Sequence, residues 1–107
     1  MINDEEYELF LNRTLNLIEN AVNFLKNDKH IVAYNKMIGV HQKICSIVEE
    51  EKKELLLNEL ICKDIIHHLL DGRYEQAKES IMIVKTNLYK IYGKVKKKNE
   101  TNRNKIF

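Results

Sequence analysis

The scarcity of chain-breaking residues is the feature that most limits what this sequence can fold into. The 107 residues contain no proline and only three glycines, Gly39, Gly72 and Gly93. Sheet-rich folds need a turn about every 8 to 12 residues, and those turns favour glycine, proline and Asn-Gly pairs. Because a few long helices need far fewer turns, the sequence predicts an all-α protein.

Apolar residues recur at steps of three and four, the spacing that places side chains on one face of a helix. We expect four helices, at about residues 4–26, 29–49, 53–70 and from 74 to the basic run at 94–98. Asp4 is the expected N-cap of the first helix, Asp28 can cap the second, and Asp71-Gly72 ends the third. The fourth helix carries the most regular apolar seam: Tyr74, Ala77, Ile81, Val84, Leu88, Ile91 and Val95.

The boundary between the second and third helices carries no glycine or proline. Residues 49–54 are all charged, which suits either a solvated loop or an exposed helical turn. A single helix running on to Asp71 would be far longer than any partner helix in the chain. We therefore predict two helices here.

Two segments 44 residues apart resemble each other. Residues 27–33 and 71–77 each open the second helix of a hairpin, and each ends in a small residue, Ala33 or Ala77. A small side chain lets two helices approach closely. Two stacked hairpins would give a four- or five-helix antiparallel bundle, although this echo alone is too weak to establish a repeat.

The chain is long enough for one domain with one core. We assign residues 1–98 to the helical bundle and residues 99–107, which lack apolar periodicity, to a flexible basic tail. Nothing resembles a signal peptide, because the N-terminus is acidic, and no apolar run approaches the roughly 18 residues of a membrane span. We therefore expect a protein of the cytosol or of the cytosolic side of a membrane.

The net charge of +2 is unevenly distributed, with an acidic start and a basic end. Both suit the helix dipole, which favours acid at a helix N-terminus and base at a C-terminus. The alternative is that the basic run contacts phosphate groups of RNA or of acidic lipids, with two tyrosines preceding it. The candidate phosphate-contacting residues are Lys94, Lys96, Lys97 and Lys98.

Histidines and cysteines on the second and third helices are candidate zinc ligands. His41 and Cys45 are four residues apart and face the same way, while Cys62, His67 and His68 lie on the next helix. The spacing of Cys62 and His67 points their side chains apart, and no C-x-x-C motif is present. We interpret these residues as core or boundary positions and expect no metal and no other cofactor.

No catalytic constellation stands out either. A nucleophilic Cys45 assisted by His41 would need an orienting acid and an oxyanion site, and neither is signalled. The chain also lacks a glycine-rich phosphate-binding loop. We predict no catalytic residues and a non-enzymatic protein.

Apolar and aromatic residues of the fourth helix also lie off its seam. A helix with more than one apolar face either sits centrally in a bundle or presents its second face to a partner. We predict a protein partner here, and a homodimer through the seam is a further possibility. The candidate partner-binding residues are Met82, Ile83, Tyr89 and Tyr92.

The second half of the chain resembles a known helical domain. An apolar helix ends in the polar turn Asp71-Gly72-Arg73, the next helix opens Tyr74-Glu75-Gln76-Ala77, and it closes with Gly93-Lys94-Val95-Lys96. The earlier helix around Asn35-Lys36-Met37-Ile38 sits where the second helix of the family sits. This order resembles the C-terminal helical domain shared by the large outer-coat subunit of the COPII vesicle coat and the steroid receptor RNA activator protein.

The resemblance implies a bundle without an active site that works as a coat or scaffold component of ER-to-Golgi vesicle transport. Its partners would be coat or scaffold subunits, at the cytosolic face of the endoplasmic reticulum. The steroid receptor RNA activator branch implies an RNA-associated, coactivator-like module, with the nucleus as the alternative location. The resemblance also allows this bundle to be the end of a longer chain.

Overall fold

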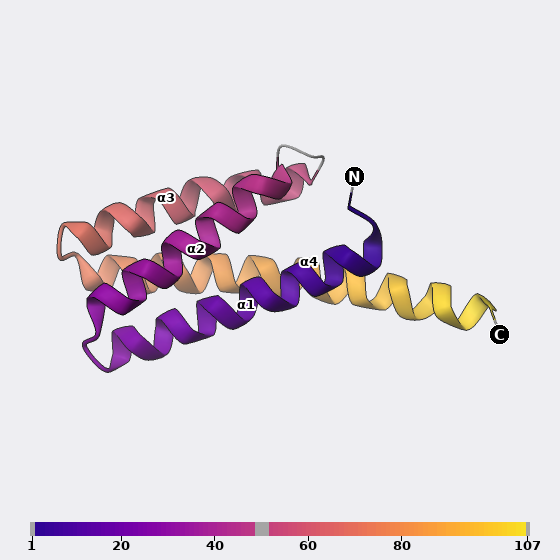
Figure 1. The fold of residues 1–107 in the computed structure, drawn as a ribbon, viewed down its shortest axis with the longest axis horizontal. Helices are drawn as coiled ribbons and strands as arrows, with labels where there is room; N and C mark the ends of the chain where they lie inside the picture. Colours follow the sequence, from indigo (N-terminus) through magenta and orange to yellow (C-terminus); the bar gives the residue numbers. More distant parts are fainter. Residues whose placement is uncertain (1, 49–51, 107) are drawn as a thin grey trace.

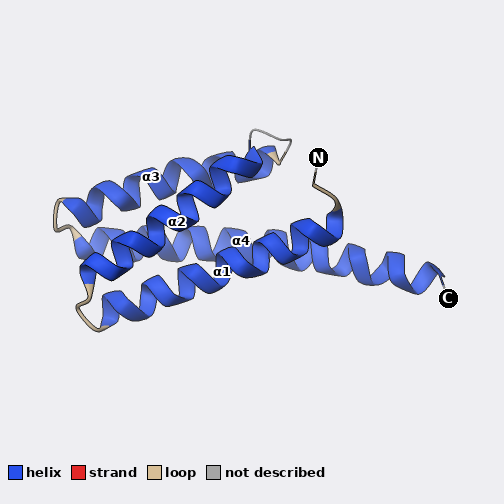
Figure 2. Cartoon of the chain, viewed as in Figure 1, coloured by secondary structure: helices blue, strands red, loops and turns tan. Residues whose placement is uncertain are grey.

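The computed structural model, which describes residues 2–48 and 52–106, is an antiparallel four-helix bundle (Figures 1 and 2). Its helices are α1 (Asp4–Lys26), α2 (His30–Val48), α3 (Leu56–Leu70) and α4 (Tyr74–Ile106), with a short 3-10 turn, η1 (Lys53–Leu55), leading into α3. The described residues contain no strand, so the predicted all-α class is confirmed, with four helices. Of the charge run at the predicted second break, residues 49–51 lie outside the described residues.

Each helix packs against two neighbours, so that the four close around one core. α1 contacts α2, α2 contacts α3, α3 contacts α4, and α4 returns to α1. The seam predicted for the fourth helix faces this core, and Ala77, Ile81, Val84 and Leu88 are fully buried. Each large apolar side chain buried in this way contributes about 1.5–3 kcal/mol. The seam is therefore used inside the chain, and the possible homodimer through it would have to open the bundle.

The two hairpin turns close with the same backbone geometry. Asp28 follows α1 with a φ of 59°, and the next N–H, that of Lys29, donates to the carbonyl of the residue five positions earlier at 2.8 Å. Gly72 follows α3 with a φ of 75°, and Arg73 donates in the same way at 2.8 Å. Both turns are Schellman motifs, which require a left-handed residue. Asp28, predicted to cap the second helix, instead terminates the first.

The echo between the two halves extends over residues 11–44 and 55–88. Ala33 and Ala77 are fully buried, and the rings of His30 and Tyr74 stack with centroids 3.6 Å apart and planes 5° apart. The hairpins α1–α2 and α3–α4 are therefore structural repeats, with α1 equivalent to α3 and α2 equivalent to α4. Further buried pairs at the same spacing of 44 residues are Leu11 and Leu55, Thr14 and Asn58, Ile18 and Cys62, Ala21 and Ile65, Leu25 and Leu69, Met37 and Ile81, Val40 and Val84, and Ile44 and Leu88.

The C-terminal segment differs from its prediction as a flexible tail beyond residue 98. α4 continues to Ile106 as a helix and extends past the N-terminus of α1 (Figure 1). Asn99 is only 3% exposed, and its Nδ2 donates to the Asp4 carbonyl at 3.0 Å and to Glu8 Oε1 at 2.9 Å. A search for apolar periodicity misses this segment because polar contacts hold it.

The start of α1 also differs from its prediction by one residue. Asn3, not Asp4, is the N-cap, and its Oδ1 accepts a hydrogen bond from the Glu6 N–H at 2.8 Å. Asp4 instead forms an ion pair with Lys98 of α4, with Oδ2 and Nζ 2.9 Å apart. The acidic start of the chain is thus tied to its basic end.

Candidate functional site

The structure separates the four predicted partner-binding residues of α4. Met82 and Ile83 are exposed and line one shallow hollow. Tyr89 is also exposed, but its hydroxyl donates to Glu19 Oε1 of α1 at 3.2 Å. Tyr92 is half-buried and packs against the core. Of the predicted set, only Met82 and Ile83 share an apolar hollow.

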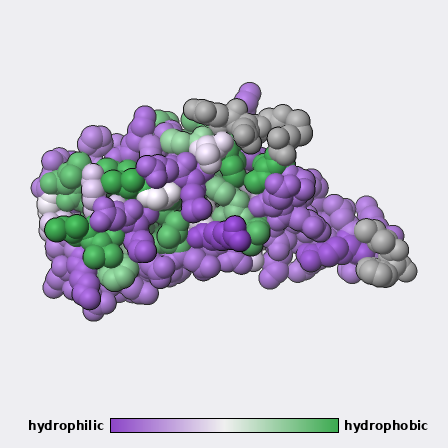
Figure 3. Space-filling view, in the orientation of Figure 1, coloured by the Kyte–Doolittle hydropathy of each residue, from purple (hydrophilic) through white to green (hydrophobic). Residues whose placement is uncertain are grey.

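A larger apolar surface lies at the end of the bundle that holds both hairpin turns, as Figure 3 shows. Ile31 is 77% exposed and Leu70 is 61% exposed, and together they line a hollow with Tyr34 and Tyr74. We call these four residues the hairpin-end patch. Sequence reasoning missed it because the patch combines residues from three helices, two from α2 and one each from α3 and α4.

The structural repeat shows that packing does not require apolar residues in this patch. The position equivalent to Ile31 in the other half is Glu75, and the position equivalent to Leu70 is Lys26. Both of these charged residues are exposed. A hydrophobic residue where the same fold accepts a charge points to a role outside folding.

The outer face of α3 shows the same asymmetry. Its exposed leucines lie at the spacing that shares one helix face, whereas the equivalent residues of α1 are exposed and polar. Exposed apolar surface therefore gathers on the α2–α3 side of the molecule. The leucines are Leu56, Leu57 and Leu60, and their counterparts are Asn12, Arg13 and Asn16.

The basic run is partly neutralised within the chain. Because α1 and α4 are antiparallel, Lys98 pairs with Asp4, and Arg103 Nη2 lies 3.9 Å from Glu8 Oε1. Lys96 Nζ lies 5.9 Å from the centroid of the Tyr92 ring. All four candidate lysines are exposed, including Lys94 and Lys97. Carboxylates of α1 therefore neutralise part of the basic charge of α4 without a phosphate partner.

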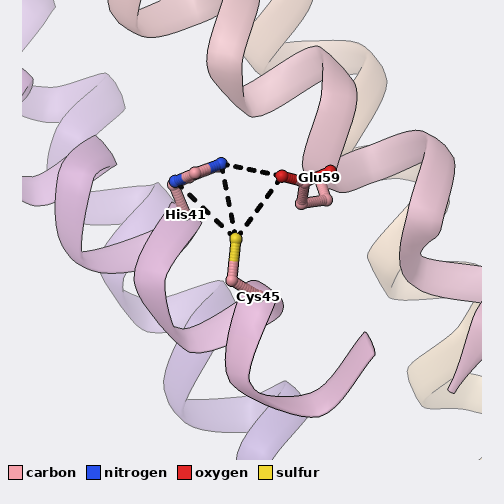
Figure 4. Close-up of side chains that lie close together, drawn as sticks. All are labelled: His41, Cys45 and Glu59. Carbon is pink, nitrogen blue, oxygen red and sulfur yellow. Dashed lines mark hydrogen bonds and ion pairs between the residues drawn. The ribbon is translucent and has the colours of Figure 1, made fainter. Parts of the chain in front are cut away.

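A polar cluster joins the C-terminal half of α2 to the first turn of α3 (Figure 4). His41 and Cys45 lie one turn apart on α2, and Glu59 projects toward both from α3. His41 Nε2 lies 3.0 Å from Glu59 Oε1 and 3.5 Å from Cys45 Sγ, and Cys45 Sγ lies 3.4 Å from the same carboxylate oxygen. The side chains are shielded, with 20% of His41 and 13% of Glu59 exposed.

The surroundings of this cluster keep its carboxylate charged. Burial by itself would raise the pKa of Glu59, but hydrogen bonds from Cys45 and His41 and the positive charge of Lys63 lower the pKa below its usual range. Lys63 Nζ lies 3.9 Å from Glu59 Oε1. Three potential ligand atoms therefore converge around a stable negative charge.

The other candidate metal ligands, Cys62, His67 and His68, do not belong to the group of converging ligand atoms. Cys62 is fully buried in the core, and burial raises the pKa of its thiol to about 12. His67 is exposed, and His68 Nδ1 accepts a hydrogen bond from Arg73 Nε at 3.0 Å. Glu59, which sequence reasoning did not single out, supplies the third group instead.

The geometry of the cluster does not suit a nucleophilic relay. Such a relay places histidine between acid and thiol, with one ring nitrogen facing each. Here Nε2 of His41 contacts both partners and is the ring nitrogen nearer to Cys45 Sγ, at 3.5 Å against 3.9 Å for Nδ1, and Glu59 contacts the Cys45 thiol directly.

The equivalent interface in the other half, between α4 and α1, holds different chemistry. The counterparts of His41 and Cys45 are Lys85 and Tyr89, and both contact Glu19 of α1. Lys85 Nζ lies 2.9 Å from Glu19 Oε1, and the hydrogen bond from Lys85 is the main reason that the pKa of Glu19 is lowered. This interface therefore holds an ion pair.

No model of a known protein family, no curated protein and no solved structure matches the chain. Within the part of the chain that the structure describes, no helix combines the length and the apolar character needed to cross a membrane.

Proposed function

We propose that this bundle is a non-enzymatic protein-binding domain whose contact surface is the hairpin-end patch. The observation that carries the proposal is the exposure of Ile31 and Leu70 where the repeat has Glu75 and Lys26. The occupant we propose is an apolar helix or turn of a partner protein, with side chains that enter the hollow between Tyr34 and Tyr74.

Met82 and Ile83 provide a second, smaller apolar surface on α4. The sequence resemblance makes vesicle-coat subunits of ER-to-Golgi transport the first partners to test. A coat or scaffold role needs rigid surfaces and no active site, which fits a bundle whose exposed apolar side chains exceed what its packing needs.

The test exchanges the patch for the residues of its own repeat. Ile31→Glu and Leu70→Lys are combined in one variant, which copies positions that the fold already accepts. Leu57→Glu is the matched comparison: Leu57 lies on the same helix as Leu70 and is equally exposed, at 61%, but belongs to the outer face of α3, so the pair of variants separates the two apolar surfaces. Each tagged chain is purified from cells with and without nuclease, and the bound proteins are quantified by mass spectrometry.

We expect coat subunits to bind the wild type and the Leu57→Glu chain, to resist nuclease, and to be lost from the double variant. Equal recovery on all three chains would contradict the proposed surface. Partners that disappear with nuclease would instead favour the RNA-associated alternative at Lys94, Lys96, Lys97 and Lys98.

A further inference from the structure

We propose that His41, Cys45 and Glu59 form a binding site for a divalent cation of the zinc class. The ligand atoms would be His41 Nε2, Cys45 Sγ and a carboxylate oxygen of Glu59, with water or an external ligand in the fourth position. The sequence led us to expect no metal, and the experiment below decides between that expectation and this site.

The distances between the three atoms match a tetrahedral zinc site. With ligand bonds of about 2.0 Å to nitrogen and oxygen and about 2.3 Å to sulfur, tetrahedral ligands lie about 3.3 Å apart for N and O and about 3.5 Å apart where sulfur is included. The observed separations are 3.0 Å for N and O, 3.5 Å for N and S, and 3.4 Å for S and O. A metal ion would therefore need only small side-chain shifts.

The ligand types select the metal. Among the described residues, these three ligand groups lie with their atoms within 4.8 Å of one another. Imidazole nitrogen and thiolate sulfur suit zinc and related transition metals, whereas magnesium and calcium prefer oxygen alone. A set of one nitrogen, one sulfur and one oxygen therefore favours Zn²⁺ and its spectroscopic substitute Co²⁺.

The helices hold the ligands in place before any metal arrives. His41 and Cys45 share one face of α2 because they are four residues apart, and Glu59 reaches them from α3. Without metal, the same atoms are hydrogen-bonded to each other. When the metal binds, the Cys45 Sγ–H proton leaves to solvent and the proton of neutral His41 resides on Nδ1, so that the thiolate and the carboxylate balance the two positive charges.

The equivalent interface explains why the site belongs to one half only. Lys85 takes the place of the ligand His41, and its ammonium group, 2.9 Å from Glu19, repels a cation, whereas Lys63 is more exposed and lies 3.9 Å from Glu59. Tyr89 occupies the place of Cys45, and its hydroxyl is a poor ligand at neutral pH. The α4–α1 interface thus has a carboxylate between two helices, contributed by Glu19 one turn beyond the position equivalent to Glu59, and serves as a comparison with no expected metal affinity.

The test is a titration of the reduced, metal-free chain with Co²⁺, followed by displacement with Zn²⁺. We expect a near-ultraviolet thiolate-to-cobalt charge-transfer band and visible bands of tetrahedral cobalt, both abolished by an equivalent of zinc. Cys45→Ser should remove the charge-transfer band. His41→Ala and Glu59→Gln should each weaken binding at least tenfold.

Two control variants separate this site from unspecific thiol or carboxylate binding. Cys62→Ala removes the other thiol, and Glu19→Gln removes the carboxylate of the equivalent interface; both should bind cobalt as the wild type does, with folding verified by circular dichroism. Absence of the bands in the wild type would overturn the proposal. So would a band that survives Cys45→Ser, or unchanged affinity in either His41→Ala or Glu59→Gln.

Discussion

The α2–α3 and α4–α1 interfaces occupy equivalent places in a structural repeat, yet they carry different chemistry. Both are framed by the same buried positions 44 residues apart, and both hold a carboxylate between two helices. In one, Glu59 faces an imidazole and a thiol; in the other, Glu19 faces an ammonium and a phenol. The buried core positions recur in both halves because the fold requires them. The polar side chains around the two carboxylates differ because the fold does not fix them.

The apolar surface follows the same division. The side of the molecule with the polar cluster also carries Ile31 and Leu70, where the other side carries Glu75 and Lys26. Substitutions that exchange equivalent residues are therefore sharper tests than substitutions to alanine, because each new side chain already occupies the equivalent position of the other hairpin.

The largest effect is expected where the repeat is most exact, in the core. Met37→Ala and Ile81→Ala truncate equivalent, fully buried side chains of α2 and α4. Each should lower the free energy of unfolding by about 2–5 kcal/mol, because each leaves a cavity. Urea denaturation measures both, and a near-neutral result for either one would show that the two hairpins do not share the core equally.

Smaller effects on stability are expected at the two turns, and the two substitutions should have opposite signs. Gly72→Ala places a Cβ on a left-handed residue with a φ of 75° and should cost about 1 kcal/mol. Asp28→Gly relieves the same conformation at a φ of 59° and should stabilise the chain by a few tenths of a kcal/mol. Thermal unfolding followed by circular dichroism compares them, and a shift of the same sign in both would break the equivalence of the turns.

The response to acid should be shared by the two interfaces. The pKa values of Glu59 and Glu19 are both lowered from the ordinary value of 4.5, so each carboxylate contributes stability above pH 4.5 that is lost as the pH falls through its folded pKa. Glu59→Gln and Glu19→Gln should each reduce the loss of stability between pH 6 and pH 3, as measured by urea denaturation at each pH. If one variant loses as much stability in acid as the wild type, the pKa of the carboxylate that it lacks is not lowered in the folded state.

The smallest effect on stability is expected at the hairpin-end patch. Ile31→Glu combined with Leu70→Lys should change the free energy of unfolding by less than about 0.5 kcal/mol per substitution, because both positions are exposed. A loss of several kcal/mol in urea denaturation would show that the patch serves folding. The proposed partner surface would then have no basis in the repeat.

Much of the fold follows from the spacing of apolar residues. The seam of α4 and the bounds of α1 are predicted because each buried face has a helical period. The structure departs from the prediction where polar contacts between distant segments decide, as where Asn99 holds the last turns of α4 against the start of α1. Periodicity within one segment carries no information about such contacts.

The polar cluster was half predictable. His41 and Cys45 were paired correctly by their spacing on one helix, but Glu59 depends on the register between α2 and α3. A signal for it existed in the echo, because the residue equivalent to Glu59 is Leu15, which is buried in the core. A carboxylate at a position where the other half buries a leucine needs a hydrogen-bond or charge partner from a neighbouring helix.

The most direct test of the difference between the two interfaces is the zinc content of the purified, reduced chain by native mass spectrometry. It compares the wild type with a variant that carries His41→Lys and Cys45→Tyr and so copies the residues of the α4–α1 interface. The account predicts one bound zinc ion for the wild type and none for the folded variant. No zinc on the wild type, or equal zinc on both chains, would contradict it.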